Sequence, residues 1–203
     1  MFPLGTVLYP GMVLPLNVFE PRYLKMVGYC LDHEYEFGVV LITRGQETGG
    51  GDERAKVATI SRILDVASLP DGRCTLRTAG VRRVRVTSWY PDDPFPQAEV
   101  EDWPDDPYGA TIRSVDPDLV VAKVTRLLQA SGRLGRDNQD PVVELGRDAV
   151  AASYHAAALA PIDTHDQLRL LSAEGPADRW ALLDEMMDEQ IDIFRFNHGG
   201  EAI

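Results

Sequence analysis

Residues 12–31, MVLPLNVFEPRYLKMVGYCL, join a β-rich run to a helix. The first part, Met12 to Val18, contains a proline, which restricts the strand to a sheet edge or a bulge. Pro21 then stands where the first turn of a helix would begin, and its missing N–H is not needed there. Apolar residues recur at positions 23, 26, 27, 30 and 31, which is the spacing of one helix face. The stretch therefore predicts a single helix inserted among strands.

Several strand-like segments follow this helix, with turn residues between them. Phe37 to Ile42 is a continuous apolar run, whereas Val57 to Leu69 alternates apolar and polar residues. The tripeptide at 70–72, Pro-Asp-Gly, is a turn signal, because proline presets φ and glycine accepts a positive φ. The remaining predicted strands are 73–78, 81–89 and 97–100, with Gly80 separating the first two. Five or six antiparallel strands with one inserted helix indicate a small, barrel-like β domain.

The second half of the chain has a helical pattern. A connector rich in proline and acidic residues, 103–109, precedes it. Asp116 and Pro117 supply an N-cap and a first helical residue. Helices are predicted from 117 to 131, from 142 to 160, from 164 to 171, and from 176 onward. The sequence thus predicts an α+β protein, with a β domain at 1–110 and a helical bundle at 116–203.

The balance of charges bears on the choice of partner. The chain has 203 residues, of which 20 are Lys or Arg and 32 are Asp or Glu, so its net charge is −12. Nucleic-acid binding depends on basic side chains that neutralise phosphates, so nucleic acids and anionic membranes are not expected partners. No apolar run approaches the roughly 20 residues needed to cross a bilayer, and the amino terminus lacks a secretory-signal pattern. We expect a cytoplasmic protein; the sequence does not predict its oligomeric state.

The sequence contains no recognisable catalytic motif. The histidines at 33, 155, 165 and 198 do not have a metal-ligand spacing, and the two cysteines are not part of a CxxC motif. Ser153 and His155 are two positions apart in a predicted helix, so their side chains point in nearly opposite directions. The glycines at 49–51 lack the lysine of a phosphate-binding loop and are expected in a mobile loop, 45–52. We therefore predict no enzymatic activity, no metal and no cofactor.

Aromatic residues flanked by prolines form one candidate binding surface. They lie between the last strands and at the connector, and exposed aromatics of this kind suit the binding of a peptide. The group consists of Trp89, Tyr90, Phe95 and Trp103. The alternative is that these side chains pack the β domain against the helices.

Arginines form a second candidate surface. Arg82, Arg83 and Arg85 lie on one predicted strand, and Arg73 and Arg77 lie on its expected neighbour. Together they would make an anion-binding patch on an acidic protein. The alternative is a solvated strand face whose arginines pair with nearby carboxylates, because surface ion pairs are common and individually weak.

The sequence also resembles a known family. Residues 2–16, FPLGTVLYPGMVLPL, and residues 18–23, VFEPRY, are closely similar to the start of the amino-terminal, substrate-binding domain of the ATP-dependent Lon protease. The similarity continues through FGVVLI at 37–42 and GVRRVRV at 80–86, and it is looser in the second half. It extends over nearly the whole chain. The resemblance implies a PUA-like β-barrel followed by a helical bundle.

The same resemblance implies a role in substrate recognition. Lon proteases contain an ATPase module and a Ser-Lys protease domain, and neither is found in these 203 residues. The chain therefore resembles stand-alone Lon-domain proteins. The expected function is the non-enzymatic, adaptor-like binding of unfolded or degron-bearing polypeptides, or of a protein partner, in protein quality control. Two alternatives stay open: a nucleic-acid-binding PUA-like module that uses the arginines, and a small-molecule enzyme with an unrecognised site.

Overall fold

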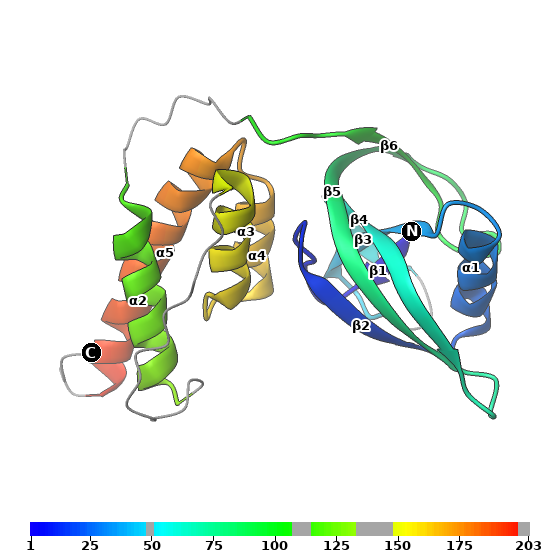
Figure 1. The fold of residues 1–203 in the computed structure, drawn as a ribbon, viewed down its shortest axis with the longest axis horizontal. Coiled ribbons are helices and arrows are strands. Elements are labelled where there is room, and N and C mark those ends of the chain that lie inside the picture. Colours follow the sequence, from blue (N-terminus) through cyan, green and yellow to red (C-terminus); the bar gives the residue numbers. More distant parts are fainter. Residues whose placement is uncertain (48–50, 107–114, 133–147, 199–203) are drawn as a thin grey trace. The chain divides into compact units, whose positions relative to one another are not determined.

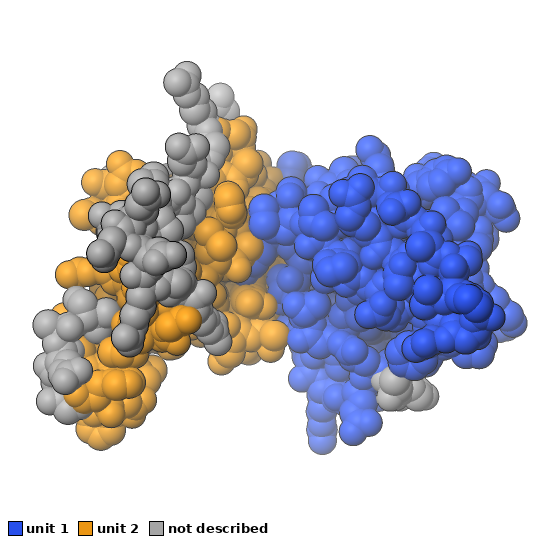
Figure 2. All heavy atoms as spheres, turned by 60° about the horizontal axis from the view of Figure 1, so that its bottom comes forward, with its two compact units in different colours: residues 1–104 blue, residues 105–203 orange. Residues whose placement is uncertain are grey.

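The computed structural model describes residues 1–47, 51–106, 115–132 and 148–198. The chain divides into two compact units, Met1–Pro104 and Asp105–Ile203 (Figure 2). The first unit contains all six described strands and one helix (Figure 1). In chain order these elements are β1 (Phe2–Leu4), β2 (Val13–Val18), α1 (Pro21–Leu31), β3 (Glu36–Arg44), β4 (Glu53–Ser68), β5 (Cys74–Trp89) and β6 (Ala98–Asp102).

The strands form one curled, mixed sheet that makes a half-barrel (Figure 1). Their order is β1-β3-β4-β5-β2, and β6 also pairs with β5. β2 pairs with the first half of β5 and β6 with the second half. β1 and β3 are parallel, which corrects the prediction of antiparallel strands alone. The connection between β1 and β3 contains β2 and α1, and parallel neighbours require such a long crossover.

β5 runs without a break, so the predicted separation of two strands at Gly80 is wrong. Gly80 stays in the strand and bonds to the segment before β2. Its N–H donates to the Met12 carbonyl (2.9 Å), and its carbonyl accepts from the Gly11 N–H (2.8 Å). A Cβ atom at position 80 would collide with the Tyr9 carbonyl oxygen. The glycine therefore permits two backbones to approach closely, and it does not mark a turn.

The core of the first unit lies between the sheet and α1. The helix begins at Pro21, as predicted, and buries Tyr23, Met26, Val27 and Cys30, which confirms its predicted apolar face. These side chains join a cluster that includes residues of β1, β3 and β5. The Phe2 ring stacks on the Tyr23 ring with centroids 4.2 Å apart. Burial of this face fixes α1 against the sheet. It thereby also fixes the positions of the residues on the outer side of the helix.

The second unit contains four described helices: α2 (Pro117–Ala130), α3 (Ala149–Leu159), α4 (Thr164–Leu171) and α5 (Pro176–Asn197). The first three all contact α5. Asp116 caps α2 as predicted, because its carboxylate accepts from the Asp118 N–H (3.0 Å). The helix predicted at 142–160 begins only at Ala149, because Asp148 is its extended N-cap residue, and it ends at Leu159; residues 142–147 lie outside the described residues. None of the described helices has the length and apolar character needed to cross a membrane.

A buried arginine joins three of these helices to the start of the unit. The Arg179 side chain on α5 donates to the Leu170 carbonyl on α4 (3.0 Å) and to the Ser153 hydroxyl on α3 (2.7 Å). It also forms an ion pair with Asp105, and its guanidinium lies 3.6 Å from the centre of the Tyr154 ring. Because a buried charge is costly without partners, this network specifies how the helices pack.

Candidate functional site

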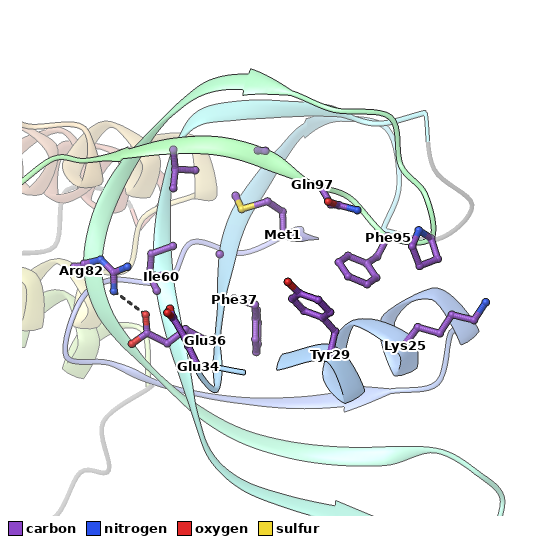
Figure 3. A pocket seen from close by; sticks show the side chains of 14 residues that line it. Met1, Lys25, Tyr29, Glu34, Glu36, Phe37, Ile60, Arg82, Phe95 and Gln97 are labelled. Atoms are coloured by element: carbon purple, nitrogen blue, oxygen red, sulfur yellow. Dashed lines mark hydrogen bonds and ion pairs between the residues drawn. The ribbon is translucent and has the colours of Figure 1, made fainter. Parts of the chain in front are cut away.

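A solvent-open pocket of about 620 Å³ lies on the first unit (Figure 3). Segments that are distant in sequence build it: the amino terminus, α1, the start of β3, the middle of β4 and the chain leading into β6. A pocket of this size can hold a large apolar side chain or a small ligand. Its apolar lining includes Met1, Tyr29, Phe37, Ile60, Pro94, Phe95, Ala98 and Val100.

Two aromatic rings form one wall of the pocket. Tyr29 on α1 and Phe95 before β6 face each other with ring centroids 5.9 Å apart and planes inclined at 53° (Figure 3). Tyr29 lies outside the buried face of the helix, and 55% of its surface stays exposed. The Tyr29 ring also stacks on the His33 ring, with centroids 4.0 Å apart. The ring is therefore held in place yet remains accessible to a ligand.

β6 forms the opposite wall. Ala98 and Val100 are half-buried and line the pocket, whereas Glu99 and Glu101, each following one of them, are exposed. This alternation follows from strand geometry, in which successive side chains point to opposite faces. β6 therefore has an apolar face toward the pocket and an acidic face away from it.

An ion-pair network borders the pocket near the start of β3 (Figure 3). Glu36 accepts from Arg82 (2.7 Å) and from Arg62 (2.6 Å), and Arg82 also pairs with Asp102 (2.9 Å). Burial raises the pKa of Glu36, but the hydrogen bonds and charges of the two arginines outweigh burial and leave the pKa below its ordinary value. Both Glu36 and Arg82 thus remain charged at neutral pH and offset each other.

The Met1 amine closes another side of the pocket. It donates a hydrogen bond to the Pro96 carbonyl (2.7 Å), which links the start of β1 to the segment before β6. Burial lowers the pKa of this amine to about 6. The Met1 side chain reaches under β6 into the apolar region (Figure 3).

Of the four aromatic residues predicted from the sequence, Phe95 lines this pocket. Trp89 is the last residue of β5 and pairs with Ala98, but it is not among the residues that line the pocket, and the Arg54 guanidinium covers its ring at 4.6 Å. Tyr90 follows it and is 52% exposed. Trp103 lies at the far end of the β5–β6 pairing, because its N–H bonds to Arg83 whereas Trp89 pairs with Ala98. The four residues therefore do not form one continuous surface.

The predicted arginines are also separated. Arg82 belongs to the ion-pair network beside the pocket. Arg83 is buried and donates to the Trp103 carbonyl (3.0 Å). The guanidinium groups of Arg83 and Arg85 lie 3.9 and 3.7 Å from the Trp103 ring centre. Arg73 pairs with Asp71 in the turn before β5. Arg82 and Arg73 thus have carboxylate partners, as the alternative of a solvated, ion-paired face expects, whereas Arg83 is buried against Trp103. Anion binding by these arginines stays a prediction.

Sequence reasoning missed most of the pocket lining. Tyr29 is an aromatic residue on α1 that does not share the helix's buried face, and this mismatch was an available signal. The sequence predicts Val100 in a short strand, but it does not predict which residues lie across the pocket from it. Met1 and Phe37 meet there only because β1 pairs in parallel with β3.

Among the described residues, one group of metal-ligand side chains comes together at the start of α4. The ligand atoms of Asp163, His165 and Asp166 lie within 4.8 Å of one another. Asp163 accepts from the Asp166 N–H (2.9 Å), and the Asp166 carboxylate pairs with Arg169 (2.8 Å). Helix capping and a surface ion pair account for this group.

Comparison with known proteins agrees with the resemblance seen in the sequence. The Lon protease of Cytophaga hutchinsonii is 26% identical over 202 residues, which cover 92% of this chain and 23% of that protein. The Lon protease of Escherichia coli K12 is 24% identical over 195 residues, covering 93% and 24% respectively. In Schizosaccharomyces pombe, the LON peptidase N-terminal domain and RING finger protein C14F5.10c is 25% identical over 203 residues, covering 86% and 42%. This chain thus spans about a quarter of the two Lon proteases and less than half of the yeast protein.

Solved structures show the same fold. The Lon N-terminal domain protein of Xanthomonas campestris aligns with a TM-score of 0.62 and 28% identity, covering 92% of this chain and 95% of that one. The N-terminal domain of a Mycobacterium avium complex Lon protease aligns with a TM-score of 0.61 and 19% identity, covering 92% and 97%, and supports the fold alone. A family model for the ATP-dependent protease La (LON) substrate-binding domain matches residues 1–189. The chain is therefore a member of the LON substrate-binding domain family.

Proposed function

We propose that this chain recognises polypeptides and that the pocket of the first unit takes an apolar side chain of an unfolded segment. The observation that carries the proposal is the accessible pair of rings, Tyr29 and Phe95, beside an edge strand. Family membership supports it, because the matched domain is described as substrate-binding. Binding would be non-enzymatic, and any adaptor role would depend on what the bound polypeptide is delivered to.

The pocket provides a physical basis for selecting unfolded chains. Folded proteins keep most large apolar side chains inside, whereas unfolded chains expose them. Burying one such side chain contributes about 1.5–3 kcal/mol, which corresponds to roughly ten- to hundredfold in affinity. A single anchor of this strength gives weak, sequence-tolerant binding, which suits recognition of many unfolded substrates.

The finer assignments belong to the same proposal. We infer that the half-barrel of the first unit is PUA-like and that the four helices of the second unit act as a bundle. Action in the cytoplasm and in protein quality control is likewise part of the proposal. Its support is the family match and the sequence similarity to Lon proteases.

Equilibrium binding to a labelled, permanently unfolded polypeptide tests the proposal. Fluorescence anisotropy would compare the unfolded polypeptide, its folded form and a single-stranded RNA. Saturable binding of the unfolded form alone is expected, and Tyr29→Ala should weaken it by about tenfold, because one pocket wall is lost.

Tyr90→Ala is the matched control, because Tyr90 is 52% exposed against 55% for Tyr29 and does not line the pocket. It should leave affinity unchanged. If Tyr90→Ala weakened binding as much as Tyr29→Ala, the pocket would not be the binding site. Binding to RNA alone would favour the nucleic-acid alternative.

A further inference from the structure

We infer that the bound polypeptide pairs as an added strand along the free edge of β6, with apolar residues alternating with basic ones. This inference rests on the proposed function and names the peptide class that the site would take. Three observations carry it: the unpaired edge of β6, the two faces of that strand, and the charge of the outer face.

The first observation is the edge itself. Among the described residues, β6 pairs with β5 alone. An edge strand directs part of its N–H and C=O groups away from its one partner, where another extended chain can bind them. Such backbone pairing is independent of side-chain identity and is a general mode of peptide recognition. The edge therefore offers affinity for unfolded chains of varied sequence.

The second observation is that the apolar face of β6 points into the pocket. Side chains of neighbouring strands share a face, so a peptide residue beside Val100 projects to the same side as Val100. On that side lie Tyr29, Phe95 and the Met1 side chain (Figure 3). A large apolar side chain of an added strand would therefore enter the pocket without any bend in the peptide backbone.

The third observation is the acidic outer face. Glu99 and Glu101 are exposed; on their β5 side, the Ser88 hydroxyl donates to the Glu99 carboxylate (3.2 Å) and Arg85 is the cross-strand neighbour of Glu101. Alternate residues of an added strand would lie beside these carboxylates, where Lys or Arg is favoured and Asp or Glu is disfavoured. The chain's net charge of −12 adds a longer-range preference for cationic segments.

The same charges argue against a second copy of this chain as the occupant. Pairing two β6 edges would bring the carboxylates of Glu99 and Glu101 beside those of the other copy, and like charges on adjacent strands are destabilising. The occupant that fits both faces is an extended segment in which an aromatic or aliphatic residue alternates with lysine or arginine.

Short labelled peptides test the pattern. The probe alternates phenylalanine with lysine, and the control has the same residues arranged in two blocks. The alternating peptide should bind about tenfold more tightly, because only it can present its rings and charges to opposite faces. In an added strand, only every second peptide N–H faces β6. N-methylation of those nitrogens should abolish the tighter binding of the alternating peptide, whereas N-methylation of the other nitrogens should preserve it.

Charge-reversal variants test the position. Glu101→Lys should weaken the phenylalanine–lysine peptide by about threefold or more and strengthen a phenylalanine–glutamate peptide. Glu189→Lys on α5 makes the same change of net charge at an exposed residue and should do neither. The strand-pairing inference would be overturned if the chain bound unfolded polypeptide but neither the alternating pattern nor Glu101→Lys affected affinity. The proposed function would then still stand. Absence of binding to every unfolded probe would overturn both.

Discussion

The rings of Tyr29 and Phe95 meet at a centroid distance of 5.9 Å, although one belongs to α1 and the other to the chain before β6. The two residues have different surroundings. Phe95 packs partly against the core, whereas Tyr29 is 55% exposed. Their contact therefore joins the folded interior to a surface that a ligand can reach, and the two residues should respond differently to truncation.

Phe95→Ala should lower the free energy of unfolding by about 1–2 kcal/mol, less than for a fully buried ring, because its side chain is only half-buried. Tyr29→Ala should change it by less than about 0.5 kcal/mol, as for most exposed positions. Urea denaturation of both variants measures this difference. Equal losses would mean that Tyr29 is a structural residue, contrary to its assignment as an accessible pocket wall.

Stability should fall in acid partly through Glu36. Burial opposes its charged form, yet bonds from Arg82 and Arg62 hold its folded-state pKa below the ordinary value of 4.5. A lowered pKa in the folded state stabilises the protein above pH 4.5, and this contribution is lost as pH falls through the folded-state pKa. Glu36→Gln should therefore be less stable than the parent at neutral pH, with the difference shrinking below pH 4.5. Urea midpoints measured from pH 3 to pH 7, roughly the range over which carboxyl groups titrate, check this; a difference that grows in acid would contradict it.

Glycine substitutions should have opposite effects at two positions. Gly80→Ala would place a Cβ against the Tyr9 carbonyl, and backbone there cannot easily move aside. We expect a loss of at least about 2 kcal/mol, as for other overpacked sites. Gly28→Ala meets nothing within 4 Å on an exposed side of α1 and should stabilise by about 0.5–1 kcal/mol. Thermal unfolding of both variants shows whether each substitution raises or lowers stability. A stabilised Gly80→Ala variant would refute the close approach of the two backbones.

In the second unit, Arg179→Met should be strongly destabilising. It removes the cation beside the Asp105 carboxylate and the donor to the Leu170 carbonyl. Loss of one member of a buried pair typically costs about 3–5 kcal/mol. The double variant Arg179→Met with Asp105→Asn should recover part of that loss, because the carboxylate charge is gone. Chemical denaturation of these two variants and of Asp105→Asn alone tests the coupling, which would be absent if the loss in the double variant equalled the sum of the two single losses.

The local patterns of the chain predicted much of the fold. Apolar spacing and Pro21 located α1, and Asp116 located the start of α2. The errors arose where tertiary contacts override local signals. Glycine is typical of turns, but Gly80 instead accommodates a neighbouring backbone within a strand. The first strand is only three residues long, which is too short to show a pattern.

The candidate site was less accessible to sequence reasoning, because its walls come from segments distant along the chain. A cluster of aromatics near 89–103 suggested one surface, yet strand pairing places Trp89 and Trp103 at opposite ends of β6. Phe95 alone of that group reaches the pocket. The sequence shows that apolar and acidic residues alternate along β6. Whether this alternation can serve binding depends on which edge of the sheet is unpaired, and the sequence does not show that.

Amide chemical-shift mapping would locate the binding surface residue by residue. Isotope-labelled protein would be titrated with an unlabelled, permanently unfolded polypeptide, and changes would be assigned along both units. We expect concentration-dependent shifts at Tyr29, Phe95 and along β6, with little change on α5. Shifts confined to the second unit, or no saturable shifts at all, would contradict recognition of polypeptides by this pocket.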